Sequence, residues 1–272
     1  NNQKDLLFAI ILALGNAADA VEIMCIGYVM NEIDNISTFQ KEFLSAAVFL
    51  GMLFGGLLCG LLSDKIGRKP CLQYSLLINT IASIASAFAP SVTWLIFCRI
   101  IGGIGIGGSV PSVFTLGAEL FPSKIRGKLL SLIASFWMVG AIYVGLVGWI
   151  MLGDDFNGNR IIPGIGWRLF ALICAIPVVV ALLLTTYIVP ESPRYLVGKH
   201  RYTEAAIILS NISNIKVSAD QLEISSSSPF ENHHDRKNKK ENLDSISAHF
   251  QSILVLFNEN LYQSTLLYMV IW

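Results

Sequence analysis

CRIIGGIGIGGSVPSVFTLGAELFPSKIRGK, residues 98–128, places a long glycine-rich apolar run directly before a short basic turn. The turn holds Lys124, Arg126 and Lys128, whereas the run before it contains a single base, Arg99. A mostly apolar run of about 20 residues is the length that a helix needs to cross a membrane. The density of small residues favours close packing against a second such helix.

The rest of the chain repeats this pattern of apolar run and polar turn. Of its 272 residues, 54% are hydrophobic and 14% are charged, and the mean hydropathy is +0.61. A soluble domain of this length usually has about a quarter of its residues charged. The sequence therefore predicts an all-α membrane protein with six spans and the start of a seventh near residue 261. The six runs are 6–30, 41–62, 71–89, 93–120, 128–152 and 166–189.

The basic residues are distributed unevenly between the two sides of these runs. Fifteen of the nineteen Lys and Arg residues lie before the first run or after the second, fourth and sixth. The positive-inside rule therefore predicts that the N-terminus and segment 190–260 are cytoplasmic, in a multi-pass protein of the plasma membrane or a vesicle. The sequon at Asn35 then falls in an outward loop and is a candidate for glycosylation.

Composition divides the chain into three parts. Residues 1–198 form the predicted bundle of six spans. Residues 199–260 begin with an amphipathic helix over 199–215 and continue as a Ser-rich, charged and flexible linker. Residues 261–272 begin a further apolar run that the end of the sequence cuts off, so we interpret the chain as a fragment of a longer protein.

The first run contains two acids, Asp19 and Glu22, one helical turn apart. An ionised side chain at the centre of a spanning helix costs about 2.5–3.5 kcal/mol, so these acids are expected to face protein or water. Asp19 and Arg99 both lie about 10 Å from the same outer edge of the membrane. We expect them to pair and to form a proton-sensitive switch. The alternatives are an acid at the interface, which suits Glu22 better, and a purely structural role for Arg99.

Three turns on the basic side each join an acid to a base. Any one of these pairs could be a solvated turn worth less than about 1 kcal/mol. Three of them at the inner ends of alternate helices predict a charge network that locks one conformation. The pairs are Asp64 with Arg68 in GLLSDKIGRKP, residues 60–70; Glu119 with Arg126 in AELFPSKIRGK, residues 118–128; and Glu191 with Arg194 in PESPR, residues 190–194.

Other classes of function find little support in the sequence. The five cysteines show no ligand spacing, and we expect them to be small buried hydrophobic residues instead of disulfide partners or zinc ligands. There is no nucleophile elbow, metal-ligand spacing or phosphate loop in a plausible context, so we expect no enzyme, no metal and no cofactor. A net charge of zero gives no indication of nucleic-acid binding. The expected partners are a small-molecule solute, the lipid bilayer and, if transport is coupled, protons.

These motifs together resemble the major facilitator superfamily, and within it the sugar and organic-ion porters. The resemblance rests on GLLSDKIGRKP, on CRIIGGIGIGG followed by ELFPSKIRGK, and on PESPRYL, and it covers about residues 6–200. The ADAVE stretch, residues 18–22, resembles the transporters related to synaptic vesicle glycoprotein 2. The resemblance implies the N-terminal six-helix half of a twelve-helix fold, in which two halves rock about a central site.

The resemblance also implies a secondary active transporter that moves a small organic solute or ion by alternating access. In proton-coupled sugar porters of this superfamily an aspartate of helix 1 and an arginine of helix 4 form a coupling pair, and Asp19 and Arg99 fall at those positions. Glu22 is then expected to contact substrate or to shape selectivity, and both acids are expected to face a central aqueous cavity. The basic-side charges are expected to latch the outward-facing state. The alternatives are an uncoupled facilitator of the same fold and a non-transporting membrane receptor or trafficking protein on a transporter scaffold.

Overall fold

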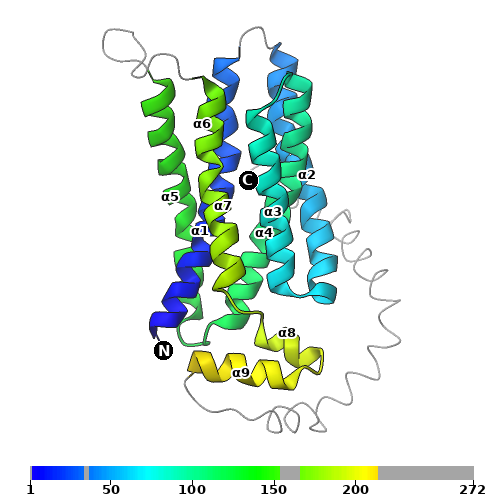
Figure 1. The fold of residues 1–272 in the computed structure, drawn as a ribbon, viewed down its shortest axis with the longest axis vertical. Helices are drawn as coiled ribbons and strands as arrows, with labels where there is room; N and C mark the ends of the chain where they lie inside the picture. Colours follow the sequence, from blue (N-terminus) through cyan, green and yellow to red (C-terminus); the bar gives the residue numbers. More distant parts are fainter. Residues whose placement is uncertain (1, 34–36, 154–165, 214–272) are drawn as a thin grey trace, which may run out of the picture. The chain divides into compact units, whose positions relative to one another are not determined.

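The computed structural model describes residues 2–33, 37–153 and 166–213, which all belong to one of the two units of the chain, Asn1–Ser218. Long helical segments run side by side in this unit, and two short helices lie across one end (Figure 1). The long segments are α1 (Asn2–Glu32), α2 (Thr38–Ile66), α3 (Arg68–Ala87), α4 (Val92–Leu120), α5 (Arg126–Leu152) and the consecutive pair α6 (Trp167–Cys174) and α7 (Ile176–Tyr187).

Each of the six predicted runs corresponds to one of these segments. The last run is divided between α6 and α7 because Pro177 cannot continue the hydrogen-bonding pattern of a helix. Within the described residues, five segments are long and apolar enough to cross a membrane, and α3 is not among them. The reason is a stripe of buried polar residues along α3, which includes Ser75, Asn79, Ser83 and Ser86.

The short helices α8 (Pro193–Gly198) and α9 (Tyr202–Ser213) mark what we name the basic end of the bundle. Lys4 lies at this end, where its Nζ donates to Asn211 O over 2.8 Å. Helix α9 corresponds to the amphipathic helix predicted over 199–215, whereas α8 was not predicted. The predicted linker, the start of a seventh span and the sequon at Asn35 lie outside the described residues.

Glycines bring α2 and α4 into direct backbone contact. A Cβ added to Gly51 would clash with Ile100 O, and one added to Gly103 would clash with Val48 O. The predicted role of the α4 glycines in close helix packing is therefore confirmed. Not every glycine of α2 has this role, because nothing lies within 4 Å of the position that a Cβ of Gly60 would occupy.

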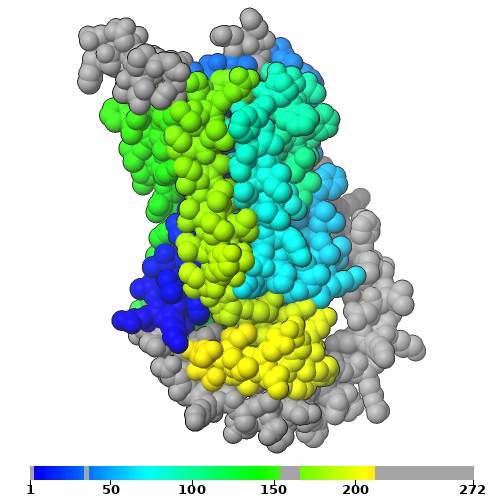
Figure 2. All heavy atoms as spheres, viewed as in Figure 1, coloured from blue at the N-terminus to red at the C-terminus, as the bar shows by residue number. Residues whose placement is uncertain are grey.

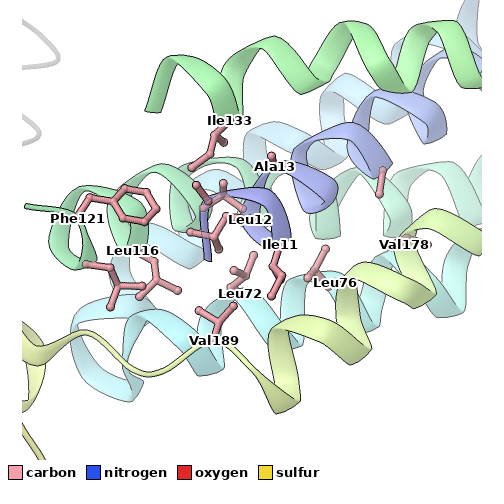
Figure 3. Packing of buried hydrophobic residues seen from close by; sticks show 14 residues of the cluster. Ile11, Leu12, Ala13, Leu72, Leu76, Leu116, Phe121, Ile133, Val178 and Val189 are labelled. Atoms are coloured by element: carbon pink, nitrogen blue, oxygen red, sulfur yellow. The ribbon is translucent and has the colours of Figure 1, made fainter. Parts of the chain in front are cut away.

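The buried apolar residues form two clusters along the bundle. One, near the basic end, joins α1, α3, α4, α5 and α7 through residues that include Leu12, Leu72, Leu116 and Ile133 (Figure 3). The other cluster uses the following part of α1, from Val21 to Val29, together with side chains of α2, α4, α5 and α6. The two acids of α1 lie where the first cluster gives way to the second.

Most of α1 is covered by its neighbours. On the face in Figure 2, α6 and α7 form a continuous band between α5 and α3, and the beginning of α1 emerges at the surface beside them. Helix α1 also packs against α4 and α5, so side chains along its middle are enclosed on several sides. This enclosure determines the surroundings of Asp19 and Glu22.

Candidate functional site

Asp19 lies at the centre of an enclosed polar cluster between α1, α3 and α4. Asp19 is 0% exposed to solvent. Oδ1 accepts a hydrogen bond from Asn79 Nδ2 at 3.2 Å, and Oδ2 accepts one from Ser109 Oγ at 2.5 Å. The two carboxylate oxygens are thus held by one side chain from α3 and one from α4, and neither of these carries a charge.

Glu22, one turn further along α1, forms the buried ion pair of this cluster. Arg99 Nη1 contacts Glu22 Oε1 and also donates to Glu22 O at 3.2 Å. Ser83 Oγ donates to the other carboxylate oxygen of Glu22 at 2.7 Å, and Arg99 Nη2 donates to Ser86 Oγ at 3.3 Å. Helix α3 therefore supplies a hydroxyl to each partner of the pair.

This arrangement corrects two predictions about the acids. Arg99 pairs with Glu22 and not with Asp19, because Glu22 lies one helical turn closer to the beginning of α4. A depth estimate from residue counting has an uncertainty of about one 5.4 Å turn and does not specify the rotation of either helix. The acids also do not face open space within the described bundle, since α1, α3 and α4 enclose both side chains.

The hydroxyl of Ser109 can respond to the protonation state of Asp19. Ser109 Oγ is 2.5 Å from Asp19 Oδ2 and 2.9 Å from Ile106 O, but it has one hydrogen to donate. When Asp19 is ionised, that hydrogen satisfies the carboxylate. When Asp19 is protonated, Asp19 can donate to Ser109 Oγ while the serine donates to Ile106 O, so both states keep their hydrogen bonds.

The partners supplied by α3 and α4 were not predicted as site residues. Asn79, Ser83 and Ser86 occur at spacings of four and three residues in an otherwise apolar run, which places them on one face of a helix. That periodicity was available in the sequence and could have identified α3 as the source of partners. Nothing comparable distinguishes Ser109, which is a single small residue in a glycine-rich stretch.

A second polar site, the charge network of the basic end, is organised around Arg68. Its Nη1 contacts Asp64 Oδ1 at 2.8 Å, as predicted, and donates to Ser63 O at 2.9 Å. Its Nε lies 3.4 Å from Glu119 Oε2, so Arg68 connects the end of α2 with the end of α4.

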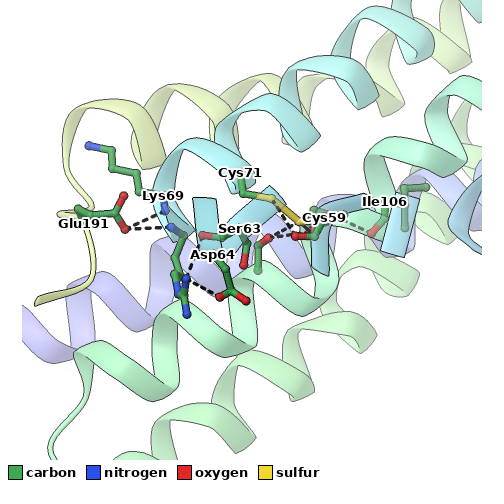
Figure 4. The surroundings of a disulfide bond; sticks show 11 residues. Cys59, Ser63, Asp64, Lys69, Cys71, Ile106 and Glu191 are labelled. Atoms are coloured by element: carbon green, nitrogen blue, oxygen red, sulfur yellow. Dashed lines mark hydrogen bonds and ion pairs between the residues drawn. A yellow bond between two sulfur atoms is a disulfide. The ribbon is translucent and has the colours of Figure 1, made fainter. Parts of the chain in front are cut away.

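Glu191 connects α7 and α8 to the beginning of α3. Its Oε1 accepts hydrogen bonds from the backbone N–H groups of Arg68 and Lys69, both at 3.1 Å, and of Ser192 at 2.8 Å (Figure 4). The carboxylate thus satisfies N–H groups in the first turn of α3, which have no partner within the helix. Gly67 permits this approach, because its φ is +112° and a Cβ there would clash with Glu191 Oε2.

Two of the three predicted pairs in this network are wrong. Glu119 contacts Arg68 instead of Arg126, whose Nε donates to Phe121 O at 3.3 Å. Glu191 contacts backbone N–H groups, and the guanidinium of Arg194 has no hydrogen-bond or ion-pair partner among the described residues. The prediction joined neighbours in sequence, whereas the fold joins residues from different turns.

Two further features lie beside this network. A disulfide links Cys59 of α2 with Cys71 of α3 (Figure 4), whereas the sequence led us to expect no disulfide. Lys69 donates from Nζ to Thr186 O at 3.0 Å. Burial lowers the pKa of Lys69, and the nearby carboxylate of Glu191 acts in the opposite direction with a smaller effect.

Comparison with known sequences identifies relatives of the chain. The family model described as "Sugar (and other) transporter" matches residues 13–271. Synaptic vesicle glycoprotein 2A of Rattus norvegicus is 35% identical over 216 residues, which are 77% of this chain and 29% of that protein. Synaptic vesicle glycoprotein 2B of the same species is 35% identical over 223 residues, which are 80% of this chain and 32% of that protein. The chain thus spans less than a third of the length of these relatives.

Comparison with solved structures identifies proteins with the same helical architecture as the described bundle. The xylose transporter XylE from E. coli, in a partially occluded inward-open conformation, matches with a TM-score of 0.70 and 24% identity over 85% of this chain and 60% of that one. Its inward-open conformation matches with a TM-score of 0.66 and 26% identity over 81% and 56%. The described bundle therefore has the architecture of one six-helix half of that fold.

Proposed function

The chain belongs to the "Sugar (and other) transporter" family, and from this premise we propose that it forms one half of a secondary transporter. The cargo is a small organic solute or ion, moved by alternating access as two halves rock about a central site. The basic end faces the cytoplasm, in agreement with the excess of Lys and Arg on that side. The membrane is the plasma membrane or that of an intracellular vesicle.

Within this function we assign proton coupling to Asp19. The observation that supports it is the imbalance of charge in the enclosed cluster, where Asp19 and Glu22 share one base, Arg99. Arg99 already neutralises Glu22, so Asp19 is the carboxyl group left without a cation. An ionised carboxylate without a cation is costly in a low-dielectric interior, so Asp19 holds a proton while enclosed and releases it when water enters.

Glu22 has a different role in this proposal from that expected of a substrate contact. Its carboxylate is occupied by Arg99 and Ser83, so it keeps Arg99 away from Asp19 and fixes α1 against α3 and α4. The charge network of the basic end, through Arg68, Glu119 and Glu191, holds the cytoplasmic side closed in the outward-facing state. Rocking of the two halves then requires this network to open.

The assignment of Asp19 can be tested without knowledge of the substrate. The full-length protein is purified, and infrared difference spectra are recorded between acidic and alkaline pH. We expect a titrating carboxyl band in the wild type that is lost in Asp19→Asn and retained in the control Asp64→Asn, which alters an exposed carboxylate. A band that persists unchanged in Asp19→Asn would exclude this residue as the proton carrier.

Transport itself is tested in liposomes with an imposed proton gradient. The first solute to try is D-xylose, because a related structure is a proton:xylose symporter bound to a sugar derivative. A coupled transporter accumulates its solute only when the gradient is present. Uptake that is indifferent to the gradient favours an uncoupled facilitator, and ligand binding without uptake favours a receptor.

A further inference from the structure

A polar cavity of about 340 Å³ opens at the basic end, apart from the enclosed cluster around Asp19. It lies between the beginning of α3, the end of α4 and the short helix α8. Its lining residues are Arg68, Glu119, Arg194, Tyr195, Gly198 and Lys199.

The lining of this cavity has an excess of positive charge. Arg68, Arg194 and Lys199 contribute three cations, and Glu119 contributes one carboxylate. The guanidinium of Arg194 has no hydrogen-bond or ion-pair partner in the part of the chain that the structure describes, so its donors are free for a ligand. A concave site with this imbalance concentrates anions from solution.

One aromatic ring holds two of these cations in place. The guanidinium of Arg68 lies 5.5 Å from the centre of the Tyr195 ring, and Lys199 Nζ lies 5.7 Å from the same centre. The ring is itself fixed, because the Tyr195 hydroxyl donates to Lys65 O at 2.8 Å. The cationic groups of Arg68 and Lys199 therefore both lie beside the same ring of the cavity lining.

The contact between Arg68 and Glu119 leaves hydrogen-bonding capacity unused. Arg68 Nε and Glu119 Oε2 are 3.4 Å apart, and within the described residues neither buried atom makes a hydrogen bond. A buried guanidinium N–H without an acceptor is costly, and Arg68 is one of the residues that line the cavity. This unused donor is a second, independent sign that the site accommodates an acceptor.

From these features we propose that the cavity at the basic end binds a phosphate group. Arg194 and Lys199 are its primary donors, and Arg68 connects it to the charge network. Guanidinium groups match the geometry of phosphate oxygens, and a negatively charged phosphate complements the excess of positive charge in the lining. The same chemistry is present in a phospholipid headgroup and in a free phosphate compound of the cytoplasm, so the experiment must separate these sources.

Binding is measured on the full-length protein in nanodiscs by two probes. Inorganic phosphate is titrated against thermal unfolding, with sodium chloride at equal ionic strength as the reference. In parallel, nanodiscs of phosphatidylcholine alone are compared with nanodiscs that contain phosphatidylinositol 4-phosphate. Stabilisation by inorganic phosphate identifies a free compound as a competent ligand, and stabilisation only by the phosphoinositide identifies a headgroup. Either result supports the site if Arg194→Gln and Lys199→Gln weaken the stabilisation.

Arg194 and Lys199 are exposed, and Glu119→Gln is nearly isosteric, so the fold is expected to persist in each variant. Arg194→Gln and Lys199→Gln should each weaken phosphate binding about tenfold, because each removes a charged donor. Glu119→Gln should tighten binding, because it removes the negative charge of the lining. The matched control is Lys124→Gln, which removes a positive charge from an exposed position of the basic end outside the cavity.

The proposal fails if neither probe stabilises the wild type beyond the chloride reference. It also fails if Arg194→Gln and Lys199→Gln bind phosphate as tightly as Lys124→Gln, since binding would then reflect only the general positive charge of this end. Tm values without phosphate confirm that each variant is folded. None of these measurements depends on transport, so they remain decisive if the proposed coupling role of Asp19 is wrong.

Discussion

The enclosed cluster around Asp19 and the charge network around Arg68 contain the same types of charged residue, but they differ in their exposure to water. In the cluster, the Arg99 and Glu22 side chains are 2% and 5% exposed. In the network, Arg68 is 17% exposed and its partner Asp64 is 73% exposed. Because of this difference, loss of one charge should cost more in the interior than at the basic end.

The energetic reason is desolvation. A buried ion pair has lost its hydration, so removal of one partner leaves a charge that neither water nor protein compensates. An exposed pair exchanges one solvated state for another and contributes little. The network therefore gains most of its stability from hydrogen bonds to backbone groups, such as those that Glu191 accepts, and less from its ion pairs.

The largest effect that would test this comparison is expected at the buried pair. Arg99→Met should destabilise the protein by about 3–5 kcal/mol, because it leaves the carboxylate of Glu22 enclosed without a cation. The double variant Glu22→Met/Arg99→Met should recover much of that loss, since neither charge then remains. The free energy of unfolding of the purified full-length protein measures both. A double variant that is no more stable than Arg99→Met would show that the pair is not electrostatically isolated.

A smaller effect is expected where a carboxylate of the network accepts from the backbone. Glu191→Ala should cost about 1–2 kcal/mol, comparable to the loss of a helix cap, because it leaves N–H groups of α3 without their acceptor. Glu191→Gln should cost less, since the amide keeps one oxygen acceptor. The free energy of unfolding of the full-length protein measures the effect of each variant.

The control for this experiment is Arg194→Ala, which should change stability by less than about 0.5 kcal/mol because its guanidinium contacts no described partner. An equal cost for Glu191→Ala and Arg194→Ala would instead support the ion pair that the sequence predicts.

The smallest expected effect is the contribution of Lys69 to the pH dependence of the free energy of unfolding. Burial lowers the pKa of Lys69, so the folded protein binds this proton less tightly than the unfolded chain does. The free energy of unfolding should therefore rise with pH between the lowered pKa and the ordinary value of 10.5. Above pH 10.5, Lys69 should make no further contribution to the slope. Lys69→Met should remove that part of the slope of unfolding free energy against pH. Lys128→Met, at an exposed position, should leave the slope in place.

The arrangement of helices was largely predictable, because span length and small-residue content act locally along the chain. Gly51 and Gly103 identify a helix contact through their lack of a side chain, and the structure has that contact. The partner of Arg99 was not predictable, since an error of one helical turn in the estimated depth is enough to place Asp19 instead of Glu22 at the level of Arg99. The partner of Glu119 was missed for another reason, because Arg68 approaches it through tertiary folding and not through proximity in sequence.

The low apolar content of α3 has a consequence for the synthesis of the protein in the membrane. Helix α3 lacks the hydropathy that the other long segments have, and its polar stripe forms hydrogen bonds with Asp19 and Glu22 of α1 and with Arg99 of α4. The ribosome synthesises α3 before α4, so the residues of α4 that contact α3 are not yet present when α3 reaches the membrane. We therefore expect α3 to integrate stably into lipid only once α4 has followed it, which makes the two helices a joint unit of insertion.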